Sequence, residues 1–157
     1  MSAPLEVTLG IIKASVTAHQ PHVQDIMRTI KRSGLEIVRT KRIFWKEEDA
    51  KQFYGEHEGR FYFPRLVQHA TSGPFVALAL CGPDAIKRWR ALIGPTHVYK
   101  AQWEHPDTLR ARYGLSDTRN GFHGSDSPES AKNELGQIFE SWDVEWFLEQ
   151  RRKELAP

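Results

Sequence analysis

A histidine next to glycine and to hydrogen-bonding side chains lies in the segment from Asn120 to Asp126, which reads NGFHGSD. Gly124 allows the backbone to turn beside the imidazole of His123 and leaves room for a ligand. Ser125 and Asp126 place two hydrogen-bonding side chains immediately after it. This setting predicts a catalytic role for His123, and the alternative is a histidine in a turn that Ser125 and Asp126 cap.

A carboxylate lies at the edge of an apolar stripe in the helix predicted to follow. Glu134 falls beside Ala131, Leu135 and Ile138 at helical spacing, so it is partly buried and needs a partner. A neutral histidine has one N–H and one lone pair, and the group that binds the N–H decides which nitrogen can attack. Glu134 is therefore a candidate to hold one nitrogen of His123 and leave the other free as a nucleophile. The alternative is an exposed glutamate at the edge of the stripe.

Three basic residues are candidates for binding an anion. Lys13 ends the first predicted strand, Arg90 lies on the helix after a central strand, and Arg110 lies in a long loop. Each alone is typical of a surface charge, but together they can balance a polyphosphate, because arginine can bind two oxygens at once. Thr96 and Asn120 can add neutral hydrogen bonds. The sequence has no glycine-rich GxxxxGK[ST] loop and no cluster with metal-ligand spacing, so a metal would arrive as a magnesium nucleotide.

Hydrophobic periodicity predicts the elements that position these residues. Strands are predicted at 7–12, 35–45, 75–81 and 122–124, and helices at 21–33, 47–54, 61–71, 83–93 and from 128 onward. The inner face of the last helix is expected to carry Ala131, Leu135, Ile138 and Trp142. The segment 96–118 shows no period and is expected to be a long loop. This order predicts an α+β fold, a ferredoxin-like α/β sandwich with a four-stranded antiparallel sheet covered by helices on one face.

Composition limits the class of protein. The 157 residues favour one domain, and a net charge of +2 gives no bulk signal for nucleic-acid binding. A single cysteine, Cys81, excludes a disulfide within the chain and fits a reducing compartment. No apolar run reaches the length of a membrane span and no signal peptide is visible, so we expect a cytoplasmic protein, with mitochondria as the alternative. Six histidines are interpreted as surface or capping residues: His19, His22, His57, His69, His97 and His105.

These motifs resemble the nucleoside diphosphate kinase family, whose signature is NxxHGSD. The resemblance runs from about Leu9 to about Phe139, which indicates a single domain over 1–157 with 141–157 as a C-terminal extension. It includes HEGRF at 57–61, SGP at 72–74, WRALIGPT at 89–96 and TRN at 118–120. The HEGRF and GPT stretches are typical of a divergent branch of the family.

The resemblance implies a ping-pong reaction between nucleoside triphosphates and diphosphates, with Mg²⁺ bound to the nucleotide. One nucleotide would phosphorylate His123, and the phosphohistidine would pass the group to another. Glu134 matches the residue that orients the histidine, and Ser125 matches the serine beside the active-site strand. The matches to nucleotide-binding residues are Lys13 and Asn120 for ribose and phosphates, Tyr54, Arg90, Thr96 and Arg110 for phosphates, and Tyr62 and Leu66 for the base.

The sequence departs from the family pattern in three places. Lys13 is followed by Ala14-Ser15 where Pro-Asp is usual, which changes the turn that aims the lysine. The stretch between Arg90 and Arg110 is a few residues longer than in the common hexameric enzymes, so we expect a monomer or dimer rather than a hexamer. Asp117 falls where an apolar residue usually closes on the base. We therefore expect weak or partner-dependent activity.

Two other classes of function compete with the kinase. The first is a weakly active or inactive member that keeps the pocket and binds another protein. The second is RNA binding, which ferredoxin-like sheets often perform, but the chain has no RNP-type aromatic motif and its charge is balanced. The intact set of His123, Glu134, Lys13, Arg90 and Arg110 favours the kinase, because a purely structural descendant has no physical need for all five.

Overall fold

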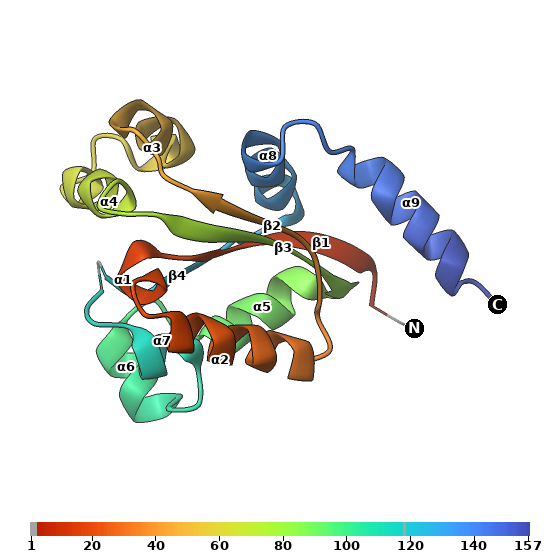
Figure 1. The fold of residues 1–157 in the computed structure, drawn as a ribbon, viewed down its shortest axis with the longest axis horizontal. Coiled ribbons are helices and arrows are strands. Elements are labelled where there is room, and N and C mark those ends of the chain that lie inside the picture. Colours follow the sequence, from red (N-terminus) through yellow and green to blue (C-terminus); the bar gives the residue numbers. More distant parts are fainter. Residues whose placement is uncertain (1–2, 118) are drawn as a thin grey trace.

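The computed structural model describes residues 3–117 and 119–157; residues 1, 2 and 118 lie outside the described part, including Thr118 of the TRN match and of the predicted loop. A four-stranded antiparallel sheet runs through the molecule in the order β2-β3-β1-β4 (Figure 1). The strands are β1 (Leu5–Ile12), β2 (Glu36–Ile43), β3 (Phe75–Pro83) and β4 (Phe122–Gly124). The described helices are α1 (Ala14–Thr17), α2 (Gln20–Arg32), α3 (Glu47–Phe53), α4 (Phe63–Ala70), α5 (Ala85–Ile93), α6 (Val98–Glu104), α7 (Leu109–Tyr113), α8 (Pro128–Ile138) and α9 (Val144–Leu155), with a short 3₁₀ turn at Gly55–His57.

The two central strands, β1 and β3, are buried on both faces. Because successive side chains of a strand point to opposite faces, Ile12 joins the core on one side while Leu9 and Ile11 join the core on the other. Both strands therefore have nearly continuous apolar sequences. The expectation of helices on only one face is wrong, because a sheet that is apolar on both sides must be covered on both, as Figure 1 shows. The predicted ferredoxin-like α/β sandwich is otherwise confirmed.

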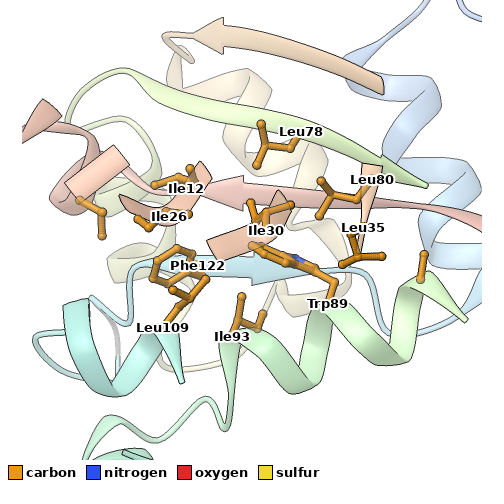
Figure 2. Packing of buried hydrophobic residues seen from close by; sticks show 12 residues of the cluster. Ile12, Ile26, Ile30, Leu35, Leu78, Leu80, Trp89, Ile93, Leu109 and Phe122 are labelled. Atoms are coloured by element: carbon orange, nitrogen blue, oxygen red, sulfur yellow. The ribbon is translucent and has the colours of Figure 1, made fainter. Parts of the chain in front are cut away.

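Trp89 fills the centre of the first core, between α5 and the sheet (Figure 2). The described members of this core are Ile12, Val16, Ile26, Ile30, Leu35, Leu78, Leu80, Ala85, Trp89, Ile93, Leu109 and Phe122. A Cβ atom added at Gly10 or at Gly124 would lie 2.9 Å from the indole of Trp89. The role expected for Gly124 is therefore corrected: it gives space to a buried tryptophan, not to a turn or a ligand.

The opposite face of the sheet is covered by α8 and α9. Ser127 caps α8, since its Oγ accepts a hydrogen bond from the backbone N–H of Ser130 at 3.1 Å. The helix ends at Ile138, so Trp142 does not belong to its inner face as expected, and packs against this second core from the turn beyond. The helix cannot continue to Trp142 because Phe139, at its C-cap, has left the helical conformation (φ −111°, ψ 65°).

The expected extension, 141–157, contains a helix that no periodicity indicated. Helix α9 buries Leu148 in the second core, and Arg151 forms an ion pair with Glu36 of β2. Leu148 is the one buried residue of α9, while Val144 and Phe147 pack against the same core and are only partly buried. A helix that contacts the core through so few residues carries little amphipathic signal.

The segment expected to be a long loop contains α6 and α7, so that expectation is wrong. These helices have 7 and 5 residues, which is too short for a 3.6-residue period to repeat clearly. Val98 and Ala101 of α6 and Leu109 of α7 are buried and attach the segment to the body of the protein. The segment therefore presents Arg110 from a helix and not from a loop.

None of the helices that the structure describes combines the length and the apolar composition that a membrane span needs.

The contacts of Trp89 give a matched pair of glycine substitutions. Gly10→Ala should lower the free energy of unfolding by about 1 to 3 kcal/mol, because the added methyl overlaps an indole that is fully buried. Gly136→Ala should instead raise it by up to about 1 kcal/mol, since Gly136 lies inside α8 with nothing within 4 Å of its missing Cβ. Urea denaturation of both variants measures the two changes. Equal effects would contradict this account of the packing around Trp89.

Candidate active site

His123 lies on the edge strand β4, where two neighbours hold its backbone. It is paired with Ile11 of β1, and its carbonyl accepts a hydrogen bond from Nε1 of Trp89 at 3.0 Å. The backbone N–H of Lys13 bonds to the carbonyl of Gly121 at 2.8 Å, which extends the pairing between the two segments. The sheet and the buried tryptophan therefore hold the imidazole in place before any ligand binds.

The imidazole of His123 is bound at one nitrogen and leaves the other available. Its Nε2 lies 2.7 Å from Oε1 of Glu134, and Oγ of Ser125 donates to the same oxygen at 2.8 Å. Because an ionised carboxylate can only accept, Nε2 must carry the hydrogen of the neutral ring, which leaves the lone pair on Nδ1. The side chains of His123 and Glu134 are 20% and 15% exposed, so the pair is mostly shielded and still open to a ligand.

Two aromatic residues at the end of α3 line the other side of the imidazole. The rings of Phe53 and Tyr54 lie edge-on to the ring of His123, with centroids 5.4 and 6.4 Å away. Tyr54 is buried, and burial, followed by the charge of Glu134, raises the pKa of its hydroxyl above the ordinary value of 10.0. The hydroxyl therefore stays protonated at neutral pH and remains a hydrogen-bond donor.

Lys13 reaches the same region from the end of β1. Its Nζ donates to Oδ1 of Asn120 at 3.2 Å, and the amide of Asn120 donates in turn to the carbonyl of Asp117 at 3.0 Å. Burial, followed by the charge of Arg110, lowers the pKa of Lys13 from 10.5 to about 7. A bound anion would offset both effects and favour the charged ammonium.

Arg110 is buried and braces the strand that carries the histidine. Its guanidinium donates to the carbonyls of Gly94 at 2.7 Å and Phe122 at 3.0 Å, while its Nε is buried with no partner among the described residues. Burial, followed by the charge of Arg90, lowers its pKa to about 10. Arg110 thus adds a positive charge within the wall of the site and has one donor unused.

Arg90 and Thr96 complete the side of the site beyond α5. Arg90 is exposed and donates to the carbonyl of Gly124 at 3.3 Å. Arg90, Thr96 and Arg110 together line a surface hollow of about 430 Å³. No ion pair joins Lys13, Arg90 or Arg110 to a carboxylate within the described residues, so their charges are available to a ligand.

Leu66 lies on α4, and Tyr62 is the residue just before this helix. Leu66 lines a small cavity together with Lys13 and Tyr54 of the group around His123. The hydroxyl of Tyr62 is 2.6 Å from Nδ1 of His57, with ring centroids 5.4 Å apart. His57 was interpreted as a surface or capping residue, but it holds the tyrosine. Neither neighbouring sequence nor period indicates this contact, which the 3₁₀ turn creates.

Asp117, where an apolar residue was expected by resemblance, has partners of its own. Its carboxylate lies 2.9 Å from Nδ1 of His97 and accepts from the backbone N–H of Val98 at 3.1 Å, which holds the first turn of α6. The hydrogen bond with His97 is the largest cause of a lowered pKa of Asp117. Asp117, which departs from the family pattern, therefore stabilises the start of α6.

His69 also differs from its interpretation as a surface or capping residue. It is 8% exposed, and its Nε2 is buried with no partner among the described residues. Burial, followed by the charges of Lys13 and Arg119, lowers its pKa to about 4. The signal for its burial is its place on α4, three residues after Leu66 and thus on the same face.

The structure brings most of the predicted site residues together. The group around β4 consists of His123, Glu134, Ser125, Lys13, Asn120, Arg90, Arg110 and Tyr54, with Thr96 in the adjoining hollow. Sequence reasoning missed the bond from Trp89 to His123, because Trp89 was assigned only to the core. Within the part of the chain that the structure describes, no group of three or more His, Cys, Asp or Glu side chains is placed to hold a metal ion.

Comparison with known proteins defines the class. The sequence model of the family described as nucleoside diphosphate kinase matches residues 6–144. The chain therefore belongs to the nucleoside diphosphate kinase family.

Individual relatives show which members of the family the chain resembles. Nucleoside diphosphate kinase 6 of Danio rerio is 43% identical over 147 residues, which cover 93% of this chain and 83% of that protein. Nucleoside diphosphate kinase 6 of Homo sapiens is 40% identical over 151 residues, covering 96% and 81%. The crystal structure of the Aquifex aeolicus nucleoside diphosphate kinase aligns with a TM-score of 0.83 at 38% identity, covering 86% of this chain and 95% of that one. The chain is thus similar to nucleoside diphosphate kinase 6, as the HEGRF and GPT stretches indicated.

The environment of Lys13 predicts how stability depends on pH. With a pKa of about 7 in the folded chain and 10.5 in the unfolded chain, the unfolded state binds more protons between these values. The free energy of unfolding should therefore rise with pH across this window, and the full penalty of burying the charge applies below about pH 7. Lys13→Met should remove this part of the rise, and ¹³Cε chemical shifts of the native lysine should titrate near the lower value. A lysine that titrates near 10.5 would contradict this account.

Proposed function

We propose that this chain is an active nucleoside diphosphate kinase, which transfers the γ-phosphoryl group of a nucleoside triphosphate to a nucleoside diphosphate through a phosphohistidine at His123. The observation that carries the proposal is the contact between Nε2 of His123 and Glu134, which leaves the lone pair of Nδ1 free. Membership in the family supports the same reaction. The reaction is proposed from the similarity to nucleoside diphosphate kinase 6 of two vertebrates. The roles of His123, Glu134 and Ser125 are proposed from their contacts in this chain.

The first half-reaction follows from the position of that lone pair. Nδ1 of His123 attacks the γ-phosphorus, a P–N bond forms, and the bond to the β–γ bridging oxygen breaks, so that the diphosphate leaves with its electron pair. The imidazole becomes positively charged as the bond forms, and Glu134 stabilises that charge through Nε2–H. Ser125 fixes the carboxylate by its own hydrogen bond. In the second half-reaction a terminal oxygen of another diphosphate attacks the same phosphorus and restores the neutral ring.

The cations around β4 fit the charge that moves in both half-reactions. Catalysis of phosphoryl transfer depends mainly on positioning the reactants and on electrostatic stabilisation of the equatorial and leaving oxygens. Lys13, Arg90 and Arg110 supply positive charge, and Tyr54, Thr96 and Asn120 supply neutral hydrogen bonds. The carboxylate nearest His123, Glu134, already binds two side chains, so the residues present fit a metal that is held by the nucleotide phosphates. Mg²⁺ bound in this way would neutralise part of the polyphosphate charge.

We assign the nucleotide base to the surface at the start of α4. Tyr62 offers an aromatic face and Leu66 an apolar one, and His57 holds the tyrosine hydroxyl. Stacking of this kind accepts any base, because every base has a π-face.

The buried cations favour a kinase over a protein-binding descendant that has lost activity. Burial disfavours the charged forms of Lys13 and Arg110, and neither has a carboxylate partner within the described residues. A chain that needed only its fold would be stabilised by replacing them. Their retention with the pair of His123 and Glu134 is explained by a polyanionic ligand that supplies the missing charge.

Phosphorylation of the protein tests the proposal. Incubation with ATP and magnesium, followed by intact mass measurement at alkaline pH, should show one acid-labile phosphoryl group, which a nucleoside diphosphate then removes. His123→Ala should abolish the label with an unchanged circular dichroism spectrum. Glu134→Gln keeps a hydrogen-bond acceptor but loses the charge, and should lower kcat by about a hundredfold. Equal labelling of His123→Ala would remove the assignment.

The site should discriminate little among bases. No described side chain near Tyr62 is known to bind a base edge, and stacking is tolerant, so kcat/KM for purine and pyrimidine nucleotides should agree within about tenfold. Steady-state rates with matched triphosphate donors measure this. A preference of about a thousandfold for one base would contradict it, because that requires hydrogen-bond readout.

Activity should be weaker than in common family members, and the protein should be a monomer or dimer. Lys13 already has φ −73° and ψ 162°, the extended conformation that a residue before proline prefers, and Ala14 is the first residue of α1. Ala14→Pro should therefore fit, make the turn that aims Lys13 rigid and raise kcat/KM. The matched control is Ala14→Gly, which changes the same residue without making the turn rigid and should not raise kcat/KM. A native protein that sediments as a hexamer and turns over as fast as common members would contradict this expectation.

A further inference from the structure

A second hollow lies beside α1. Its volume is about 380 Å³. It is lined by Ala14, Ser15, Thr17, Ala18, Arg42, His69, Ser72, Gly73, Pro74 and Arg119. None of these residues carries a role in the proposed phosphoryl transfer. The lining comes from α1, β2, the end of α4 and the segment before β4, so the fold and not one loop creates it.

The lining of this hollow is positively charged. Arg42 and Arg119 are exposed, and neither guanidinium forms an ion pair or hydrogen bond with the described residues. No carboxylate is among the lining residues. Burial lowers the pKa of His69 most, and the charges of Lys13 and Arg119 lower it further, so positive charge beside the hollow acts on this buried ring.

The polar groups of the hollow are mostly unused donors. Thr17 donates its hydroxyl hydrogen to the carbonyl of Pro74 at 2.6 Å, and Ser72 donates to the carbonyl of His69 at 2.7 Å. By contrast, Oγ of Ser15 and Nε2 of His69 are buried and have no partner among the described residues. A buried polar group without a partner costs free energy, so these two atoms call for a ligand.

We propose that this hollow binds a phosphate group, held by Arg42 and Arg119 with Ser15 and His69 beneath them. The donors exceed the acceptors, which matches an oxyanion with acceptor oxygens on every side. Two guanidinium groups match a tetrahedral dianion better than a carboxylate, since each can bind two of its oxygens. The size of the hollow accommodates free phosphate and also the phosphate tail of a nucleotide, which would make this a site separate from the one at His123.

Nuclear magnetic resonance of His69 reports on the hollow directly. The full-length His123→Ala protein is titrated with inorganic phosphate at constant ionic strength, and the imidazole resonances of His69 are followed. We expect saturable shifts, and a pKa of His69 that rises when phosphate is bound. Arg42→Ala and Arg119→Ala should each weaken the binding by about tenfold, because each removes a charge-assisted hydrogen bond. Ser15→Asp, which adds a carboxylate to the hollow, should abolish it.

Three controls make the result specific. Arg32→Ala removes the same charge from the end of α2, outside the hollow, and should bind phosphate like the parent. Acetate at equal ionic strength should not reproduce the shifts. Titration with ADP identifies the source of the phosphate group: saturation at lower concentration than with phosphate assigns the hollow to a nucleotide tail, and the reverse assigns it to the free ion. Resonances of His69 that do not move, or that move equally in Arg32→Ala, Arg42→Ala and Arg119→Ala, would overturn the proposal.

Discussion

The hydrogen bond between His123 and Glu134 joins the edge strand of the sheet to helix α8, and the proposed phosphoryl transfer depends on it. It fixes which nitrogen carries the hydrogen, and so which nitrogen can attack a phosphorus atom. The bond exists in this geometry because both partners are held from behind. Trp89 binds the carbonyl of His123, and Ser125 donates to the carboxylate of Glu134. Small residues at Gly10 and Gly124 make space for the tryptophan, so the first core and the nucleophile are parts of one packing arrangement.

Positive charge is distributed around this bond at a cost in stability. Burial, followed by the charge of a neighbouring arginine, disfavours the charged forms of Lys13 and Arg110. Their backbone and amide partners, such as Asn120 and the carbonyl of Phe122, stabilise the side chains but do not neutralise them. A polyphosphate would supply the missing negative charge. The unneutralised charges of Lys13 and Arg110 lower the stability of the unliganded protein and favour a polyanionic ligand. Functional sites commonly depart in this way from the most stable arrangement.

Much of the fold could be predicted from the sequence, because the central strands have a strong signal. The strand predicted at 75–81 and the helix predicted at 83–93 correspond to β3 and α5. Short or weakly amphipathic elements could not be found in this way. Helices α6 and α7 are too brief to repeat a period, and α9 has one buried residue. This limit does not explain the error about the covering of the sheet, because α8, which covers the second face together with α9, was predicted.

The candidate site was predictable in its composition and not in its geometry. The spacing of Glu134 on its helix indicated that it could bind His123. Only the folded backbone determines that Glu134 contacts Nε2 rather than Nδ1 of the imidazole. The contact between His57 and Tyr62 arises from tertiary packing, and the sequence around it gives no signal. The burial of His69 had a signal, since His69 lies on the same face of α4 as Leu66. The conformation of Lys13 is likewise extended despite the loss of the usual proline, since α1 begins at the next residue.

The central claim, that Glu134 directs the phosphoryl group to Nδ1, is tested most directly by the position of phosphorus on the ring. Protein labelled with ¹⁵N at histidine is phosphorylated with ATP and magnesium, and correlation of ³¹P with the two ring nitrogens of His123 is recorded at alkaline pH. The account predicts phosphorus bonded to Nδ1, with Nε2 still protonated and hydrogen-bonded to Glu134. Phosphorus on Nε2, or on a residue other than His123, would contradict it.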